Sequence, residues 1–216
     1  ISRALAGKEG VAVCGYHGWH DWYLSANLGT DDKLSGHLLP GLSTAGVPES
    51  LRGSVHPFEY NDFDELSKIV SNQSIGVIKM EVMRSVEPQN NFLQKVRQIC
   101  DDNGIVLVFD ECTSGFRETF GGLHAKYGVM PDVAVYGKTL GNGYAISAVV
   151  GRADVMRMAE TTFISSTFWT ERIGSAAGLK TLEVMAKVQP WNMVTKTGKK
   201  VRNLWQNMAD KHDLKI

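Results

Sequence analysis

Five short and almost continuously apolar runs recur along the 216-residue chain, with amphipathic segments between them. Runs of this kind are typical of strands that are buried on both faces of a sheet. Their alternation with helical patterns favours a mainly parallel sheet with helices on either side. The sequence therefore predicts an α/β fold, a three-layer αβα sandwich. The expected strands are 11–15, 75–80, 105–110, 132–137 and 145–151.

Four segments have the spacing of amphipathic helices. In the second of them, Phe92, Val96 and Ile99 fall on one face, and Gly104 is a suitable C-terminal stop. Residues 16–58 have little periodicity, so we expect a long loop region there, with room for one short helix, and loops of that length are usually functional. The expected helices are 62–70, 91–103, 171–187 and 191–211, the last two separated at Pro190.

Charge and cysteine content narrow the class of partner. Lys plus Arg and Asp plus Glu both total 23, so no overall positive field favours nucleic acid or an anionic membrane. No apolar run approaches the ~18 residues that span a bilayer, and the N-terminus lacks a signal-peptide layout. Cys14, Cys100 and Cys112 are odd in number and lack C-x-x-C spacing, which argues against disulfides or zinc. We expect a cytoplasmic protein with reduced thiols and a small-molecule partner.

A lone lysine, Lys138, follows an apolar strand inside the glycine-rich stretch VYGKTLGNG. Such a turn lets the backbone pass close to a bound group, and lysine supplies either a phosphate counter-charge or an amine nucleophile. A nucleotide-binding P-loop would need its first glycine at position 132, which is Asp132, so that interpretation fails. A functional amine or a plain surface lysine remains.

An acid occupies the equivalent place on the neighbouring expected strand. Asp110 ends the strand 105–110, and Lys138 comes just after the strand 132–137. Ligands in such folds bind at the carboxyl ends of strands, so we expect the two side chains to share one crevice. The alternative for Asp110 is a strand-end carboxylate that caps the following turn.

Six segments, in order, give this pair a family context. In them the chain resembles the fold-type I class III aminotransferases, which depend on pyridoxal 5'-phosphate (PLP), and it is most similar to the glutamate-1-semialdehyde 2,1-aminomutase-like branch. A chance match of all six in the family's order is improbable. The segments are GYHGWHD at 15–21, GVPE at 46–49, EYND at 59–62, VFDECTSGFR at 108–117, YGVMPDVAVYGKTLGNGY at 127–144 and STFWTE at 166–171.

The resemblance implies a role for each member of the pair. Lys138 matches the lysine that holds PLP as a Schiff base, and Asp110 matches the acid that keeps the pyridine nitrogen protonated. It also implies transfer of an amino group between an amino donor and a carbonyl compound, or a shift of that group within one substrate as in the aminomutase. A copy of the fold that serves only in binding or assembly is the alternative from another class.

Five further residues match family positions. Tyr16 and His17, in the YHG motif, and Cys112, on the opposite face of the ring, are implied as cofactor-binding residues. Thr167 matches a hydroxyl that reaches the cofactor phosphate of a neighbouring subunit, which implies a homodimer. Glu81 is a possible site acid. Ordinary packing is the alternative for Tyr16 and Cys112, a helix cap for Thr167, and a structural role for Glu81.

The chain departs from the family pattern in one segment and covers only part of it. It reads EVMRSVEP, with Val82 in place of a proline and Val86 in place of an asparagine, which puts the substrate in doubt. The spacing of His17 and His20 alone does not predict a metal site. The resemblance implies that 1–188 is the central part of an incomplete PLP-binding large domain and that 189–216 leads towards a small C-terminal domain. We expect the segment by itself to bind PLP weakly or not at all, because the phosphate-cup loop would lie upstream.

Overall fold

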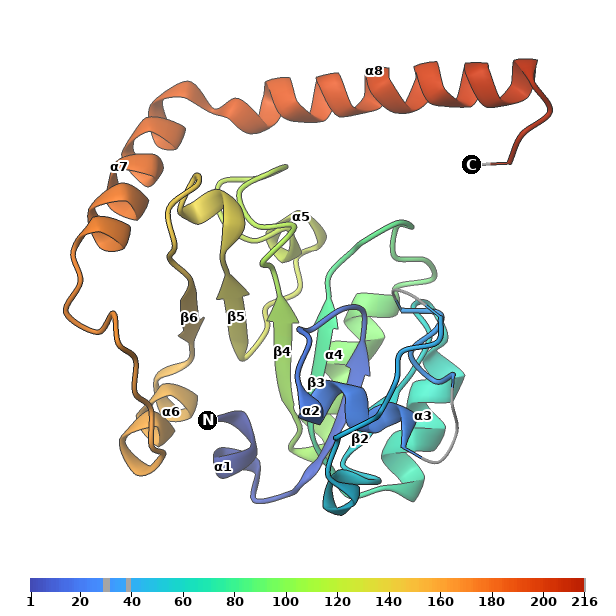
Figure 1. The fold of residues 1–216 in the computed structure, drawn as a ribbon, viewed down its shortest axis with the longest axis vertical. Helices are drawn as coiled ribbons and strands as arrows, with labels where there is room; N and C mark the ends of the chain where they lie inside the picture. The colour runs from blue at the N-terminus through green and yellow to red at the C-terminus, as the bar shows by residue number, and fades with distance from the viewer. Residues whose placement is uncertain (29–31, 38–39, 216) are drawn as a thin grey trace.

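A computed structural model describes residues 1–28, 32–37 and 40–215. Its centre is a six-stranded sheet in the order β2-β1-β3-β4-β5-β6 (Figure 1). All five expected strands are confirmed, although the last is shorter than 145–151. The strands are β1 Gly10–Cys14, β2 Val55–Pro57, β3 Ile75–Glu81, β4 Val106–Asp110, β5 Val133–Tyr136 and β6 Ala148–Gly151.

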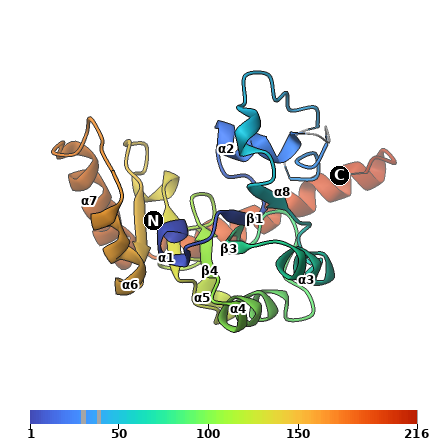
Figure 2. The same ribbon diagram turned by 90° about the horizontal axis from the view of Figure 1, so that it is seen from below.

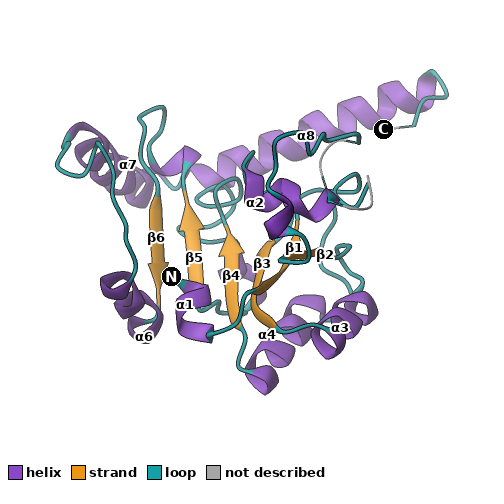
Figure 3. Ribbon diagram, turned by 60° about the horizontal axis from the view of Figure 1, so that its bottom comes forward, coloured by secondary structure: helices purple, strands orange, loops and turns teal. Residues whose placement is uncertain are grey.

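The sheet is parallel except at one edge. The pairs of β1 with β2, β1 with β3, β3 with β4 and β4 with β5 are parallel, and β6 runs antiparallel to β5 (Figure 3). The predicted mainly parallel sheet is therefore confirmed. Because the parallel strands point the same way, residues that follow β1, β3, β4 and β5 gather at one edge of the sheet.

Helices cover one face of the sheet through α3 and α4 (Figure 2). Met80 and Phe109 point to this face, where they pack in one cluster with Phe92 and Val96 of α4. Gly104 ends α4 in a left-handed conformation, as expected. The main helices are α3 Phe63–Asn72, α4 Phe92–Asn103, α7 Ile173–Val188 and α8 Pro190–Lys211, and the short ones are α1 Ser2–Ala6, α2 Asp21–Leu24, α5 His124–Tyr127 and α6 Ala153–Arg157.

The opposite face is covered by α1, α2 and α6. Val13, Val77 and Val108 point to this side and form a second cluster with Tyr23 of α2 and Val155 of α6. Alternate residues of one strand thus enter different clusters, as the twofold repeat of a strand requires. The three-layer αβα sandwich predicted from the sequence is confirmed.

The region 16–58 is more structured than a long loop with one helix. It contains α2, two short 3₁₀ turns and the edge strand β2 among its described residues. The register pairs Val11 with Val55 and Val13 with Pro57. Proline lacks an amide hydrogen and is tolerated at a sheet edge, which is where β2 lies. A strand of three residues that ends in proline gives little signal in a sequence.

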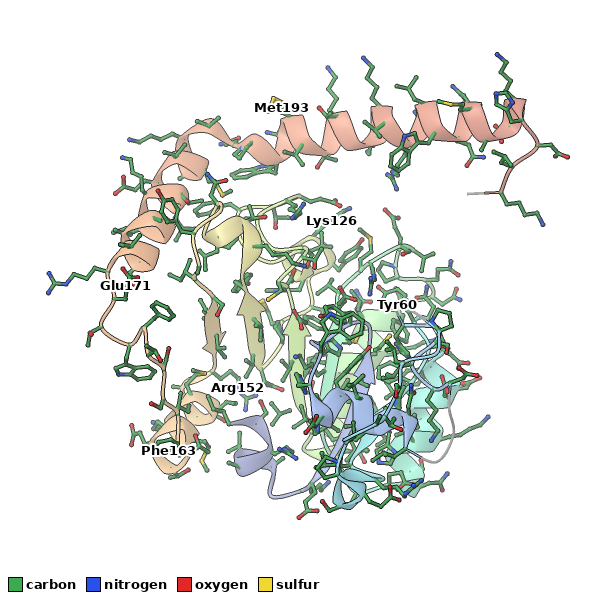
Figure 4. The ribbon with its side chains drawn as sticks, in the orientation of Figure 1. Tyr60, Lys126, Arg152, Phe163, Glu171 and Met193 are labelled. Atoms are coloured by element: carbon green, nitrogen blue, oxygen red, sulfur yellow. The ribbon has the colours of Figure 1, made fainter. Side chains whose placement is uncertain are left out.

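Asp132 fastens β4 and β5 at the end of the sheet opposite to their carboxyl ends. Its Oδ2 accepts a hydrogen bond of 2.7 Å from the Leu107 amide, and its own amide donates to the Leu107 carbonyl at 2.9 Å. Arg97 of α4 and Arg152, labelled in Figure 4, form ion pairs of 3.0 and 2.8 Å with the same carboxylate. Its side chain is 5% exposed, and these partners offset the cost of burying it.

The C-terminal helices α7 and α8 leave the sheet (Figure 1). They carry exposed apolar side chains, among them Met193, which points away from the sheet in Figure 4. Phe163, in the segment before α7, is 96% exposed. A monomer rarely exposes so many large apolar side chains without a partner for them. Ile216, the end of the expected segment 189–216, lies outside the described residues.

Candidate functional site

The strands β3, β4 and β5 end at or just before three charged residues, Glu81, Asp110 and Lys138. Glu81 pairs in register with Asp110, and Asp110 pairs with Val135, three residues before Lys138. The expected placement of Asp110 and Lys138 at one edge of the sheet is therefore borne out by the strand order.

Asp110 is a buried carboxylate with three donors around it. Its Oδ2 lies 3.0 Å from His17 Nδ1 and 3.4 Å from Lys79 Nζ, and its Oδ1 accepts from the Cys112 amide at 3.2 Å. Burial alone would raise the pKa of Asp110, but the hydrogen bond from His17 and the charge of Lys79 outweigh it and lower the pKa to about 2. Asp110 is thus ionised at neutral pH.

Lys138 opens a short 3₁₀ turn, Lys138–Leu140, directly after β5. Its φ of +43° is rare for a residue with a side chain, and such outliers cluster at functional sites. The Lys138 amine donates a hydrogen bond of 2.6 Å to Thr113 Oγ1. Thr113 lies three residues after Asp110, so the loop after β4 and the turn after β5 meet at the amine.

Cys112 lies between the two groups. Its amide contacts Asp110, and its sulfur would lie 3.1 Å from a Cβ placed on Gly137, next to Lys138. A side chain at position 137 would therefore press against the Cys112 sulfur. Burial, followed by the negative charge of Asp110, raises the pKa of the Cys112 thiol, and the positive charge of Lys138 opposes the shift. The thiol is therefore neutral at pH 7.

Glu111 anchors the loop that carries Cys112 and Thr113. It is completely buried, and its two oxygens accept hydrogen bonds from the Leu123 amide, the His124 amide and ring, and the Ser114 hydroxyl. Burial would raise the pKa of Glu111, but these donors, His124 first, lower it. Sequence reasoning did not single out this residue, because an acid beside Asp110 has no pattern of its own.

His17 and Tyr16 lie in the loop after β1. Both nitrogens of His17 face oxygen atoms, Asp110 Oδ2 and, at 3.1 Å, the Cys14 carbonyl. Tyr16 is half-buried, and its ring centroid lies 5.1 Å from that of Trp19. The structure thus brings His17 into contact with Asp110 and places Tyr16 one residue away.

Glu81 contacts the same loop. Its Oε2 accepts from the Tyr16 amide at 3.1 Å and lies 3.5 Å from Arg84 Nη1. Gly15, with a φ of +105°, passes so close that a Cβ there would collide with the Glu81 carboxylate. Glu81 therefore supports the segment that carries Tyr16 and His17.

Thr167 lies apart from these residues, exposed in the segment before α7. The helix-cap alternative does not hold, because α7 begins at Ile173 and its first amides donate to Glu171. Among the residues that the structure describes, no hydrogen bond joins Thr167 to Asp110 or Lys138. Its predicted role across a subunit interface stays a prediction.

Lys79 is a site residue that sequence reasoning missed. It stands inside the apolar run IGVIKM, which we interpreted as a buried strand, and its charge was the available signal.

A hollow of about 720 Å³ opens beside Lys138. The residues around this hollow include Phe116, Arg117, Lys138, Tyr144, Met185 and Pro190.

Within ranges 1–28, 32–37 and 40–215, no group of three or more His, Cys, Asp or Glu residues could hold a metal ion. Over the same part of the chain, no helix is both long and apolar enough to cross a bilayer.

Known proteins are similar to this chain in sequence and in fold. The 3-aminobutyryl-CoA aminotransferase of Cloacimonas acidaminovorans is 32% identical over 93% of this chain and 46% of its own length, and the glutamate-1-semialdehyde 2,1-aminomutase of Methanocaldococcus jannaschii is 30% identical over 100% and 52%. A PLP-bound structure of the FumI protein from Sphingopyxis sp. MTA144 aligns with a TM-score of 0.81 at 25% identity, over 98% of this chain and 50% of that one. The chain thus spans about half the length of these relatives. The family model for class III aminotransferases matches residues 15–215, and the chain belongs to that family.

Proposed function

We propose that the protein containing this chain is a PLP-dependent enzyme that transfers an amino group between a small amino donor and a carbonyl compound. The observation that carries the proposal is the pair formed by ionised Asp110 and the strained Lys138, at the ends of adjacent parallel strands. Family membership supports it, since relatives named as aminotransferases and as aminomutases match the chain. In this proposal, 1–188 belongs to the cofactor-binding domain and 189–216 leads out of it.

The residues present fit PLP. A protonated pyridine nitrogen needs a carboxylate that stays ionised, and the donors around Asp110 provide one. An aldehyde needs an amine on the other side, which Lys138 supplies. When bound, PLP would act as an electron sink for charge that develops on the substrate α-carbon.

Lys138 would have two tasks at one atom. Its Nζ would hold the cofactor through the aldehyde, and the same amine would take a proton from the substrate α-carbon and return it. Thr113 Oγ1, 2.6 Å from Nζ, holds the amine at the end of β5.

The other matched residues would hold and shield the ring. Tyr16 would offer a flat aromatic face and Cys112 a small apolar one, while His17 would keep Asp110 oriented. Thr167 would contact the cofactor phosphate of a partner copy in a homodimer, and its exposed position before α7 is compatible with that role. The exposed apolar side chains of α7 and α8 support an assembly. A cytoplasmic location is part of the proposal and can be tested by cell fractionation.

Two other functions are to be compared with this one. An amino shift within a single substrate uses the same residues, and it is favoured by the relatives named as aminomutases. A binding or assembly module without catalysis would be favoured by the altered segment EVMRSVEP. Retention of both Asp110 and Lys138 argues against that module. Turnover of a panel of amino donors separates the aminotransferase from the module, because a module binds PLP without any transfer.

Borohydride trapping on the full-length protein tests the assignment of Lys138. After incubation with PLP and reduction, we expect a pyridoxyl group on the peptide that contains Lys138, detected by mass spectrometry. The Lys138→Ala variant should lose this label, and Lys126→Ala, which removes an exposed lysine paired with Glu118 at 3.0 Å, should keep it. A label of equal yield in Lys138→Ala, or none in the wild type, would refute the proposal.

A further inference from the structure

Lys79 is a charged residue in the middle of the buried strand β3. Its neighbours in register are Val13 on β1 and Val108 on β4, both buried, and its side chain is 22% exposed. The aliphatic stem therefore packs between valines, and the amine reaches the carboxyl end of the sheet. There it lies 3.4 Å from Asp110 Oδ2.

A lysine in this place is costly unless it has a counter-charge. Strand positions between two valines are normally apolar, and partial removal of an ammonium group from water is unfavourable. Asp110 offsets this penalty, but Asp110 already has the His17 ring at 3.0 Å and the Cys112 amide at 3.2 Å. Two basic side chains, those of His17 and Lys79, thus converge on the Oδ2 atom of Asp110. One of them would be enough to orient the carboxylate.

We propose that Lys79 is a positioning residue that acts through Asp110, as a fixed cation that lowers the affinity of the Asp110–cofactor pair for a proton. The inference rests on the proposed function, in which Asp110 faces the pyridine nitrogen of PLP. The amine would not compete with Lys138 for the aldehyde. Because the ring nitrogen and the aldehyde carbon stand at opposite sides of the ring, an amine next to Asp110 lies on the nitrogen side.

The groups around Asp110 determine the direction of this effect. His17, in the loop after β1, and Lys79, on β3, are the basic groups in contact with it. The Cys112 amide, in the loop after β4, donates to it, and Glu81 is the acidic group in register beside it. A positive charge 3.4 Å from Asp110 Oδ2 opposes the binding of a further proton to the pair. With Lys79 present, the ring nitrogen therefore loses its proton at lower pH than it would with an apolar residue at position 79.

The test uses the full-length protein loaded with PLP labelled with ¹⁵N in the ring. The ¹⁵N chemical shift reports protonation of the ring nitrogen during a pH titration. We expect Lys79→Met to raise the pH of deprotonation by about one unit or more, the size typical of one nearby opposite charge. Lys79→Arg keeps the charge and should restore a value close to the wild type. Lys126→Met, which removes a lysine from the exposed pair with Glu118, is the matched control and should not shift it.

A second readout needs no cofactor. In the unloaded protein, the carboxyl ¹³C signal of Asp110, identified by its loss in Asp110→Asn, should titrate at higher pH in Lys79→Met than in the wild type. Unchanged midpoints in both titrations, in a Lys79→Met protein that still binds PLP, would overturn the inference and leave the proposed function intact. Failure of the wild type to bind PLP would instead refute the proposed function, and the unloaded titration would still measure the coupling between Lys79 and Asp110.

Discussion

Replacing Glu111 with alanine should loosen the loop that carries Cys112 and Thr113 while leaving the rest of the fold in place. The carboxylate accepts from two buried backbone amides, those of Leu123 and His124, each at 3.0 Å. In Glu111→Ala both amides lose their acceptor in a place that water does not reach. The segment 111–124 should then open more often than the sheet does.

The expected change in exchange rate follows from the two backbone amides, those of Leu123 and His124, that are left without an acceptor. A buried donor without a partner costs about 1–3 kcal/mol, so two of them give about 4 kcal/mol for opening this segment. Since each 1.36 kcal/mol is a factor of ten, exchange of these amides should become about 10³-fold faster. Glu111→Gln keeps one oxygen acceptor and should show an intermediate change of about 10-fold to 100-fold.

Hydrogen exchange followed by mass spectrometry measures this directly in the full-length protein. Peptides that cover 111–124 should exchange faster, and peptides from β3 and α3 should not change. Glu118→Gln, which disrupts only the exposed pair with Lys126, is the control and should change exchange by less than tenfold, because such pairs contribute up to about 1 kcal/mol. If peptides of Glu111→Ala that contain Leu123 exchange at the wild-type rate, the buried carboxylate does not hold the loop and the reasoning is wrong.

Two further predictions concern acid stability and a close contact near Lys138. The pKa of Asp110 falls from 3.8 to about 2 on folding, so its contribution of about 2 kcal/mol is fully present above pH 3.8 and is lost as the pH falls towards 2. Between about pH 5 and about pH 2, the range in which this carboxylate changes charge, the free energy of unfolding measured with denaturant should depend less on pH in Asp110→Asn than in the wild type. The same pH dependence in both proteins would contradict the assigned pKa shift. A Cβ on Gly141 would lie 2.1 Å from the Tyr144 carbonyl, so Gly141→Ala should open the turn after Lys138, destabilise the protein by about 1–3 kcal/mol and weaken PLP binding. Gly198→Ala, which meets no atom within 4 Å on α8, should be neutral or slightly stabilising, and equal effects of the two substitutions in denaturation would count against this explanation.

The sheet was predictable because its strands are buried on both faces. Such strands read as apolar runs, and the ends of β4 and β5 could be located to within one residue from VLVFD and VAVY. The placement of Asp110 and Lys138 followed from the rule that parallel strands end at one edge. Strand β2 could not be found in this way, because three residues ending in Pro57 form a strand only through pairing with β1.

The contacts within the site were less predictable than its location. His17 reaches Asp110 across 93 positions of sequence, and Glu111 holds amides 12 and 13 residues away, through loop shapes that no local pattern encodes. Lys79 was visible as a charge in an apolar strand, yet its partner depends on the register between β3 and β4. The role predicted for Thr167 would involve a partner copy, and it stays a prediction.

The carboxylate of Asp132 has a consequence for how this fold can vary. It holds β4 to β5 at the ends where these strands start. A slip of one residue in this pairing would displace Lys138 by about 3.3 Å relative to Asp110 and move each side chain of β5 to the opposite face of the sheet. The spacing of Asp110 and Lys138 is therefore set by the hydrogen bonds between Asp132 and Leu107, at the far end of the same strands. The loops that follow these strands can change in length and sequence without altering that spacing.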